Sequence, residues 1–136
     1  GGLGGTYAGN PLAIAAAHAV IDAMAEERLP ERGGALGDRL QAMLEGMRAD
    51  VPQIFDVRGL GAMVAVEFNR AGPTGQSAEP DADMAKRVQT EALARGLILL
   101  TCGVNANVVR FLFPLTTTQA VFDEAMGIIS ESLLGA

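Results

Sequence analysis

The chain has 136 residues, of which 49% are hydrophobic, with 10 Lys and Arg against 16 Asp and Glu. This length fits one globular domain with a single core, and the composition is not that of a disordered protein. The net charge of -6 repels phosphate backbones and anionic membranes, so neither nucleic acid nor a membrane is an expected partner.

Cys102 is the only cysteine, so no disulfide can form within the chain, as is usual in a reducing compartment. We therefore expect a cytoplasmic protein. Residues 1–5 are four glycines and one leucine, and the first residue is not methionine. Because a natural polypeptide rarely begins in this way, we expect the chain to be a segment of a longer protein.

Two helices are expected in the first fifty residues. Asn10 and Pro11 are typical of a helix start, since the Asn side chain caps free amides and Pro has no amide to satisfy. The helix that follows has an Ala-rich apolar stripe from Leu12 to Met24. Pro30 begins a second helix with an apolar row of Leu36, Leu40, Met43, Leu44 and Met47. Three glycines each weaken it by ~1 kcal/mol relative to Ala: Gly33, Gly34 and Gly37.

The pattern changes to period two over residues 60–68, which predicts a strand. Its two faces carry Leu60, Ala62, Val64, Val66 and Phe68 on one side and Met63, Ala65 and Glu67 on the other. Residues 69–80 are rich in Gly, Pro and Ser without periodicity, so we expect a mobile surface loop there. Asp81 then opens a helix, and Gly96 follows its last turn.

Two short β-rich runs, residues 97–101 and 108–113, are expected to pair antiparallel. Thr116 and Gln119 have the spacing of a capping box at the start of a closing helix. The order is helix, helix, strand, helix, strand, strand, helix. This order predicts an α+β fold in which helices cover one face of a small antiparallel sheet.

The glycine-rich start followed by Thr6 is a candidate phosphate-binding turn. Amides without side chains can approach an anion closely, and the Thr hydroxyl adds a donor. The stretch has neither the GK[ST] of a P-loop nor the G-x-G-x-x-G spacing. On spacing alone, a flexible linker is the favoured alternative.

Arg110 lies between Val109 and Phe111 in an apolar run, where a guanidinium needs an anionic partner. A bound carboxylate is one such partner, because the planar guanidinium binds it through two parallel hydrogen bonds. The alternative is an internal salt bridge to an acidic side chain of this chain. The residues alone leave both interpretations open.

No role is assigned to His18, Cys102 or Lys86, and no catalytic residue is expected in this segment. His18 lies inside a helix, Cys102 lies in a hairpin loop without an expected base, and Lys86 is expected in solvent. No combination of His, Cys and carboxylates has the spacing of a metal site.

Three stretches resemble the class III, fold-type I pyridoxal-phosphate aminotransferases, in the same order along the chain. They are GTYAGNPL at residues 5–12, RGLGAM at 58–63 and VRFLFPL at 109–115, and LLTCG at 99–103 resembles the 4-aminobutyrate branch of the family. The resemblance covers essentially the whole chain. It implies a glycine-rich phosphate-contacting segment with connecting helices at residues 1–50 and a C-terminal small α+β domain at residues 51–136.

The resemblance also implies roles for three residues. Gly5 and Thr6 would bind the phosphate of pyridoxal 5'-phosphate, with Thr6 reaching into the active site of the neighbouring subunit of a homodimer. Arg110 would bind the α-carboxylate of glutamate or 2-oxoglutarate. The implied reaction transfers the amino group of 4-aminobutyrate to 2-oxoglutarate and gives succinate semialdehyde and glutamate.

Other donors stay open within the family: ornithine, acetylornithine, diaminobutyrate or 5-aminovalerate. A non-catalytic ligand-binding or dimerisation module is the alternative from another class, because the fold alone does not decide function. Lys86 does not match the motif of the family's Schiff-base lysine. We therefore expect the segment alone to be inactive.

Overall fold

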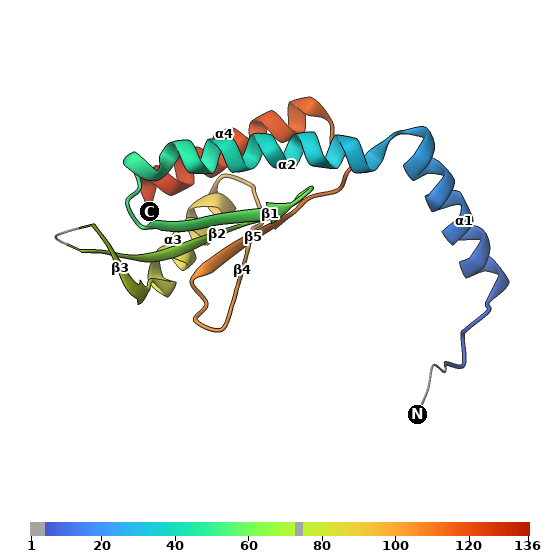
Figure 1. Cartoon of the computed structure of the whole chain (residues 1–136), viewed down its shortest axis with the longest axis horizontal. Helices are drawn as coiled ribbons and strands as arrows, with labels where there is room; N and C mark the ends of the chain where they lie inside the picture. The colour runs from blue at the N-terminus through green and yellow to red at the C-terminus, as the bar shows by residue number, and fades with distance from the viewer. Residues whose placement is uncertain (1–4, 73–74) are drawn as a thin grey trace.

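The computed structural model describes residues 5–72 and 75–136 and combines helices with an antiparallel sheet (Figure 1). The helices are α1 (Pro11–Glu26), α2 (Leu29–Gly46), α3 (Ala82–Ala94) and α4 (Gln119–Gly135), with a short 3-10 helix at Met47–Ala49. The strands are β1 (Ile54–Leu60), β2 (Met63–Gly72), β3 (Gly75–Pro80), β4 (Leu100–Cys102) and β5 (Val108–Leu112). The expected α+β class is confirmed.

The sheet has the order β1-β2-β5-β4, and β3 pairs with the far part of β2. All pairings are antiparallel. The strand order makes β2 and β5 the central strands. The register places Ala65 of β2 opposite Arg58 of β1 and also opposite Arg110 of β5. Directly opposed residues share one face of a sheet, so these three side chains belong to the same face.

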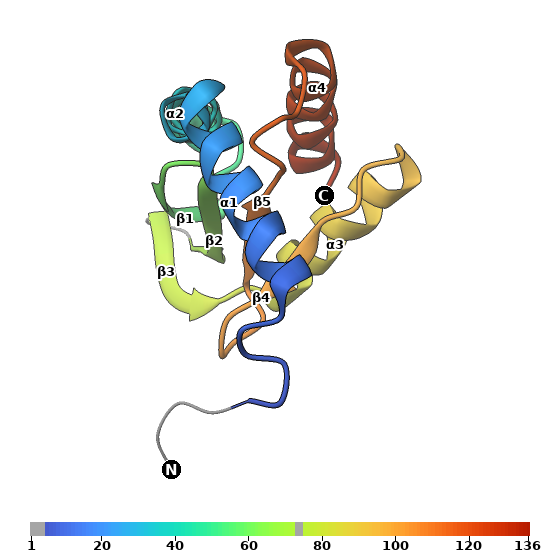
Figure 2. The ribbon, with the colours of Figure 1, turned by 90° about the vertical axis from the view of Figure 1, so that its right-hand side faces the viewer.

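The other face of the sheet is covered by α2, α3 and α4, and Figure 2 shows α2 and α4 over the same side of the strands. The strand residues that face these helices are buried: Ile54, Val64, Val66, Phe68, Val109 and Phe111. The same core includes Leu36, Leu40 and Leu44 of α2. Side chains before and after residue 50 therefore pack together, while the division of the chain at that point stays a prediction.

Three expected boundaries are confirmed by local contacts. The Asn10 side chain accepts hydrogen bonds from the amides of Leu12 and Ala13, at 2.9 and 3.2 Å. Asp81 accepts one from the amide of Met84 at 2.9 Å and begins α3. Gly96 has φ +89° after the last turn of α3, where a left-handed residue is favoured.

The expected strand over residues 60–68 is partly wrong. It begins at Met63, while Leu60 ends a separate strand, β1, that the sequence pattern did not predict. Gly61 has φ +57° in the turn between the two strands, and Leu60 is 82% exposed. The apolar alternation ran through this turn, so period alone did not separate β1 from β2.

The expected loop at residues 69–80 is wrong for the described residues, because β2 continues to Gly72 and β3 covers Gly75–Pro80. Residues 73 and 74 lie outside the described part of the chain. An ion pair of 3.3 Å joins Arg70 on β2 to Glu79 on β3. Cross-strand pairing thus overrides the turn-rich composition of this stretch.

Thr118, not Thr116, is the N-cap of α4. Its hydroxyl oxygen accepts a hydrogen bond from the amide of Val121 at 3.4 Å. Thr117 instead donates its hydroxyl to the carbonyl oxygen of Pro114 at 2.7 Å. Because three threonines occur in a row, the spacing alone did not identify the capping residue.

Helix α1 extends away from the sheet, and none of its residues is buried (Figure 1). Its expected apolar stripe therefore does not pack against the described residues. Exposed members include Leu12, Val20 and Ile21. None of the helices in the described part of the chain is long and apolar enough to cross a membrane.

Candidate functional site

Arg110 faces the side of the sheet that no helix covers. Val109 and Phe111 on either side of it point into the core, so alternation along β5 places Arg110 on the open face, where it is exposed. Within the described residues, no hydrogen bond or ion pair joins its guanidinium to another residue. The internal salt bridge that the sequence left open is not formed there, so this cation is available to an anion.

The surroundings of Arg110 on the open face are small or apolar. Ala65 lies opposite it on β2, and Leu100 lies opposite it on β4. The next row of the same face holds the opposed pair Met63 and Leu112, both exposed. An exposed guanidinium beside apolar side chains suits a ligand that has a carboxylate and an aliphatic part.

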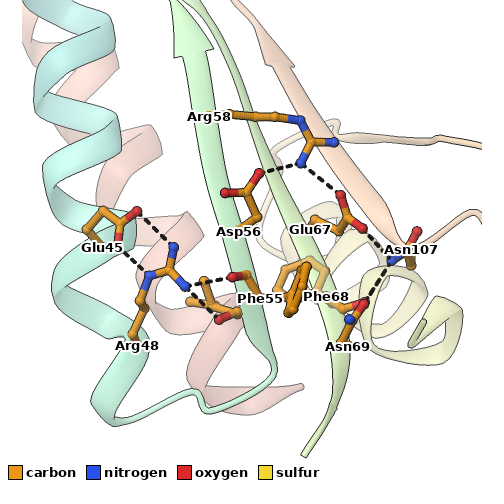
Figure 3. Close-up of polar contacts among 10 residues, drawn as sticks. Glu45, Arg48, Phe55, Asp56, Arg58, Glu67, Phe68, Asn69 and Asn107 are labelled. Carbon is orange, nitrogen blue, oxygen red and sulfur yellow. Dashed lines mark hydrogen bonds and ion pairs between the residues drawn. The ribbon is translucent and has the colours of Figure 1, made fainter. Parts of the chain in front are cut away.

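Arg58 lies in the same row and, unlike Arg110, is paired with two carboxylates. Its Nη1 atom donates to Asp56 Oδ2 at 2.6 Å and to Glu67 Oε2 at 2.8 Å (Figure 3). These two hydrogen bonds, of which the one to Asp56 has the larger effect, raise the pKa of the Arg58 guanidinium. The sequence pattern placed Glu67 on the face of Ala65, but this cluster of charges was not predicted from it.

Asn107 holds the turn before β5 against β2. It is buried, and its side-chain amide donates to the carbonyl oxygen of Phe68 at 2.9 Å, with weaker contacts to Asn69 Oδ1 at 3.4 Å and Glu67 Oε1 at 3.5 Å (Figure 3). The amide of Phe68 in turn donates to the carbonyl oxygen of Asn107 at 2.9 Å. These contacts fix the start of β5 and thus the register that positions Arg110.

Gly5 and Thr6 lie in an exposed turn before α1. The amide of Ala8 donates to the carbonyl oxygen of Gly5 at 3.2 Å, which forms the turn. A Cβ added at Gly5 would meet nothing within 4 Å, so the backbone there is open to a ligand. No bond within the described residues occupies the Thr6 hydroxyl. The rest of the glycine-rich start, residues 1–4, lies outside the described part.

The structure does not bring Gly5 and Thr6 together with Arg110. Helix α1 carries the N-terminal turn away from the sheet and from β5 (Figure 1). The phosphate-binding candidates and the carboxylate-binding candidate therefore do not form one site within this chain.

A hollow of about 520 Å³ lies between α4, the segment before β4 and the end of β5. Its lining is apolar and includes Leu97, Phe113 and Met126, with Arg110 as the one charged residue among the described residues that border it. Leu100, Arg110 and Leu112, which belong to the open face, also border this hollow, so it adjoins the candidate carboxylate site.

The three residues without an expected role have ordinary surroundings. His18 is exposed on α1, and Cys102 is half-buried at the end of β4. The Lys86 ammonium donates to Gln89 Oε1 at 2.8 Å on the surface of α3. Among the residues that the structure describes, no group of three His, Cys, Asp or Glu side chains is placed to hold a metal ion.

Comparison with known proteins places the chain in a family. The family model of the class-III aminotransferases matches residues 1–133. The 5-aminovalerate aminotransferase DavT of Pseudomonas aeruginosa is 47% identical over 131 residues, which are 96% of this chain and 30% of that protein. The 4-aminobutyrate aminotransferase GabT of Escherichia coli is 43% identical over 131 residues, with the same coverage. The chain thus spans about 30% of the length of these curated relatives.

Solved structures agree with this placement. A transaminase from the marine bacterium Virgibacillus has a TM-score of 0.83 at 28% identity, over 98% of this chain and 30% of the transaminase. An amine transaminase from an uncultivated Pseudomonas species, solved in the PLP-bound form, has a TM-score of 0.80 at 29% identity, over 96% of this chain and 29% of its own. The architecture is that of the small C-terminal domain of fold-type I transaminases. By sequence and by fold, the chain belongs to the class-III aminotransferases.

Proposed function

We propose that the chain is the C-terminal part of a pyridoxal-phosphate-dependent aminotransferase that transfers the amino group of 4-aminobutyrate to 2-oxoglutarate. The observation that carries the proposal is the unpaired, exposed Arg110 guanidinium on the open face of β5. 2-Oxoglutarate and glutamate each bring an α-carboxylate that such a guanidinium binds through two parallel hydrogen bonds. A homodimer and a cytoplasmic location are part of the same proposal.

A second donor, 5-aminovalerate, has its own support. The relative named for that donor is 47% identical to this chain, against 43% for the relative named for 4-aminobutyrate. The two donors differ by one methylene, and both place a single carboxylate far from the amino group. Arg110 would therefore play the same part with either donor, and the residues that the structure describes offer no contact that separates them.

Gly5 and Thr6 fit the phosphate of the cofactor. The Thr6 hydroxyl has no partner in the described residues, and no side chain blocks the backbone at Gly5. We infer that Thr6 donates its hydroxyl to the phosphate. Because α1 separates Thr6 from Arg110, the inference also supports a dimer in which Thr6 serves the neighbouring subunit. When bound, pyridoxal phosphate supplies the electron sink for the carbanion at the reacting carbon.

Arg110 orients the oxo acid. A carboxylate held by both guanidinium nitrogens has one allowed plane, which fixes the direction of the adjacent carbonyl group. Asn107 and the pairing of β5 with β2 hold the strand under Arg110 in register. The ω-amino donor carries no carboxylate next to its reacting carbon. Arg110 therefore has an anionic partner in one half of the reaction and none in the other.

The test is an assay of the full-length protein with 2-oxoglutarate and one donor at a time, in which glutamate is measured. We expect turnover with 4-aminobutyrate or 5-aminovalerate to exceed turnover with ornithine, acetylornithine or diaminobutyrate. A preference for one of those three would contradict the proposed donor class. Absence of glutamate with every donor would favour a non-catalytic module instead.

The isolated segment provides a control. With pyridoxal phosphate, a donor and 2-oxoglutarate, the segment should form no more glutamate than a heat-treated sample. The reason is that Lys86, on the surface of α3, does not match the motif of the lysine that forms the Schiff base with the cofactor. Turnover by the segment that disappears in Lys86→Ala would show that Lys86 is the Schiff-base lysine and would contradict the expectation that the segment is inactive.

A further inference from the structure

The row of the open face that holds Arg110 holds a second arginine. The register aligns Arg58 on β1, Ala65 on β2 and Arg110 on β5. Neighbouring strands are about 4.8 Å apart, so the backbones of the two arginines are about 10 Å apart. Ala65 between them has only a methyl group. No bulky side chain in this row therefore separates the two cations.

Arg58 does not add a free positive charge to this face. It is bound by Asp56 on its own strand and by Glu67 on β2, at 2.6 and 2.8 Å. One guanidinium and two carboxylates leave the cluster with a net charge of about -1 at neutral pH. Because Glu67 lies on the strand next to Arg110, part of this negative charge is only one strand away from it.

We propose that the cluster of Asp56, Arg58 and Glu67 sets the strength with which Arg110 holds a dicarboxylate. The proposal rests on the proposed function, in which Arg110 binds the α-carboxylate of 2-oxoglutarate. The charge of Arg58 is neutralised by Asp56 and Glu67, and the net negative charge of the cluster repels a dianion. An ω-amino donor has no net charge as a zwitterion, so its binding is affected little. The cluster thus weakens the binding of the dicarboxylate relative to that of the donor, so that a bound dicarboxylate is more readily replaced by the donor.

The size of the effect follows from Coulomb's law. One unit charge about 10 Å away changes the affinity for a unit charge about twofold at the dielectric constant of water and about 15-fold at an effective value of 20. The side chains of the cluster are partly exposed, with 50% for Arg58 and 25% for Glu67, and salt screens them. We expect changes of about two- to fivefold per unit charge.

Two charge-neutralising variants in the full-length holoenzyme test the proposal, because both break the ion pair of Arg58 with Glu67 and they change the charge in opposite directions. Glu67→Gln should lower the KM for 2-oxoglutarate and the Kd of glutarate, an unreactive dicarboxylate, by the factor given above. Arg58→Gln should raise both values by a similar factor. The KM for 4-aminobutyrate should stay unchanged, and the difference between the variants should shrink in high salt. Asp56→Asn is a second variant of the first kind.

A purely structural role of the cluster gives a different result. Loss of the ion pair would then shift both variants in the same direction, and this outcome, or no shift in either, would overturn the proposal. The matched control is the pair Arg70 and Glu79, which lies further along β2. Arg70→Gln and Glu79→Gln should leave glutarate binding unchanged. If they shift it as much as the cluster variants do, the effect belongs to the overall charge and the proposal fails.

The variant Arg110→Ala separates this proposal from the proposed function. If Arg110→Ala leaves glutarate binding unchanged, Arg110 does not bind the carboxylate, and both the proposed function of Arg110 and the cluster proposal fail. If it weakens glutarate binding while Glu67→Gln and Arg58→Gln fail to move in opposite directions, the carboxylate site stands and only the cluster proposal is refuted.

Discussion

Gly37 of α2 lies directly against the carbonyl oxygen of Gly61. A Cβ added to Gly37 would come within 1.8 Å of that oxygen, so no larger residue fits without movement of the backbone. Gly33 is similarly close to Leu115, with 2.8 Å between an added Cβ and the leucine side chain. Glycines that lower the helix propensity of α2 therefore allow it to sit on the turn between β1 and β2.

Gly37→Ala should destabilise the chain by ~1 to 3 kcal/mol, because the added methyl group forces α2 away from this turn. Gly34→Ala is the matched control in the same helix, since its added Cβ would meet nothing within 4 Å. This control should stabilise the chain by ~0.5 to 1 kcal/mol through a higher helix propensity. Urea unfolding followed by circular dichroism measures both changes. Equal effects of the two variants would contradict the close approach of α2 to the turn.

Arg110→Lys keeps the charge and removes the planar pair of donors. In the full-length enzyme it should slow the half-reaction with 2-oxoglutarate more than the half-reaction with 4-aminobutyrate. Arg110→Ala should raise the barrier of the 2-oxoglutarate half by ~2 to 5 kcal/mol, since a carboxylate is then left without its partner. Single-turnover rates of the two halves measure the difference. An equal loss in both would mean that Arg110 supports the fold and does not bind the α-carboxylate.

Thr6→Ala should weaken the binding of pyridoxal phosphate to the full-length enzyme by about one to two powers of ten, through loss of a hydrogen bond of ~1.5 to 3 kcal/mol to a charged group. Thr6→Ser keeps the hydroxyl and should retain most of the affinity. Because the cofactor would bridge two subunits, it should also stabilise the dimer in the parent enzyme. Titration of the apoenzyme and sedimentation with and without cofactor test these points. Unchanged affinity in Thr6→Ala would refute the role of Thr6.

Glu45 makes the stability of the chain depend on pH. Its carboxylate accepts two hydrogen bonds from Arg48, and these bonds hold the pKa of Glu45 below its ordinary value. Arg48 also donates to the carbonyl oxygen of Phe55 at 2.8 Å and so ties the end of α2 to β1. A lowered pKa in the folded state stabilises the fold above the ordinary carboxyl pKa. This contribution is lost as the pH falls through the lowered value.

Glu45→Gln should therefore remove part of the acid-dependent loss of stability. Urea unfolding at neutral and at acidic pH gives the free energy of unfolding of both proteins, and the gap between them should narrow in acid. Glu124→Gln is the control, since Glu124 is exposed on α4 and forms no ion pair within the described residues. A Glu45→Gln protein whose pH dependence matches that of the wild type would refute the role of this pair.

The sequence predicted best what short-range chemistry decides. Asn10 and Asp81 are caps because their side chains bond to amides two or three residues away, and spacing along the chain is enough to find them. The position of Arg110 in a strand was predicted for the same reason, from its apolar neighbours. That it faces an open side and lacks an internal partner depends on where the helices lie, which the sequence did not reveal.

Pairing between strands that are consecutive in the chain accounts for the errors. The expected loop at residues 69–80 forms strands because its two halves pair with each other, Asn69 opposite Pro80 and Gly72 opposite Gly75, which the turn-rich composition of this stretch did not indicate. Strand β1 was not predicted because its register shifts between Ile54 and Asp56, and this shift interrupts the alternation of apolar side chains. The cluster around Arg58 likewise joins residues from two strands, so only their pairing brings the three charges together.

The isolation of α1 has a consequence for the rate at which its amide hydrogens exchange with deuterium. A helix of 16 residues without tertiary packing is only marginally stable in water, so its hydrogen bonds open without unfolding of the rest. In this chain taken alone, the amides of α1 should exchange far faster than those of α2, which is anchored by Leu36, Leu40 and Leu44. In the parent enzyme, slow exchange along α1 would mark the surface on which this helix rests.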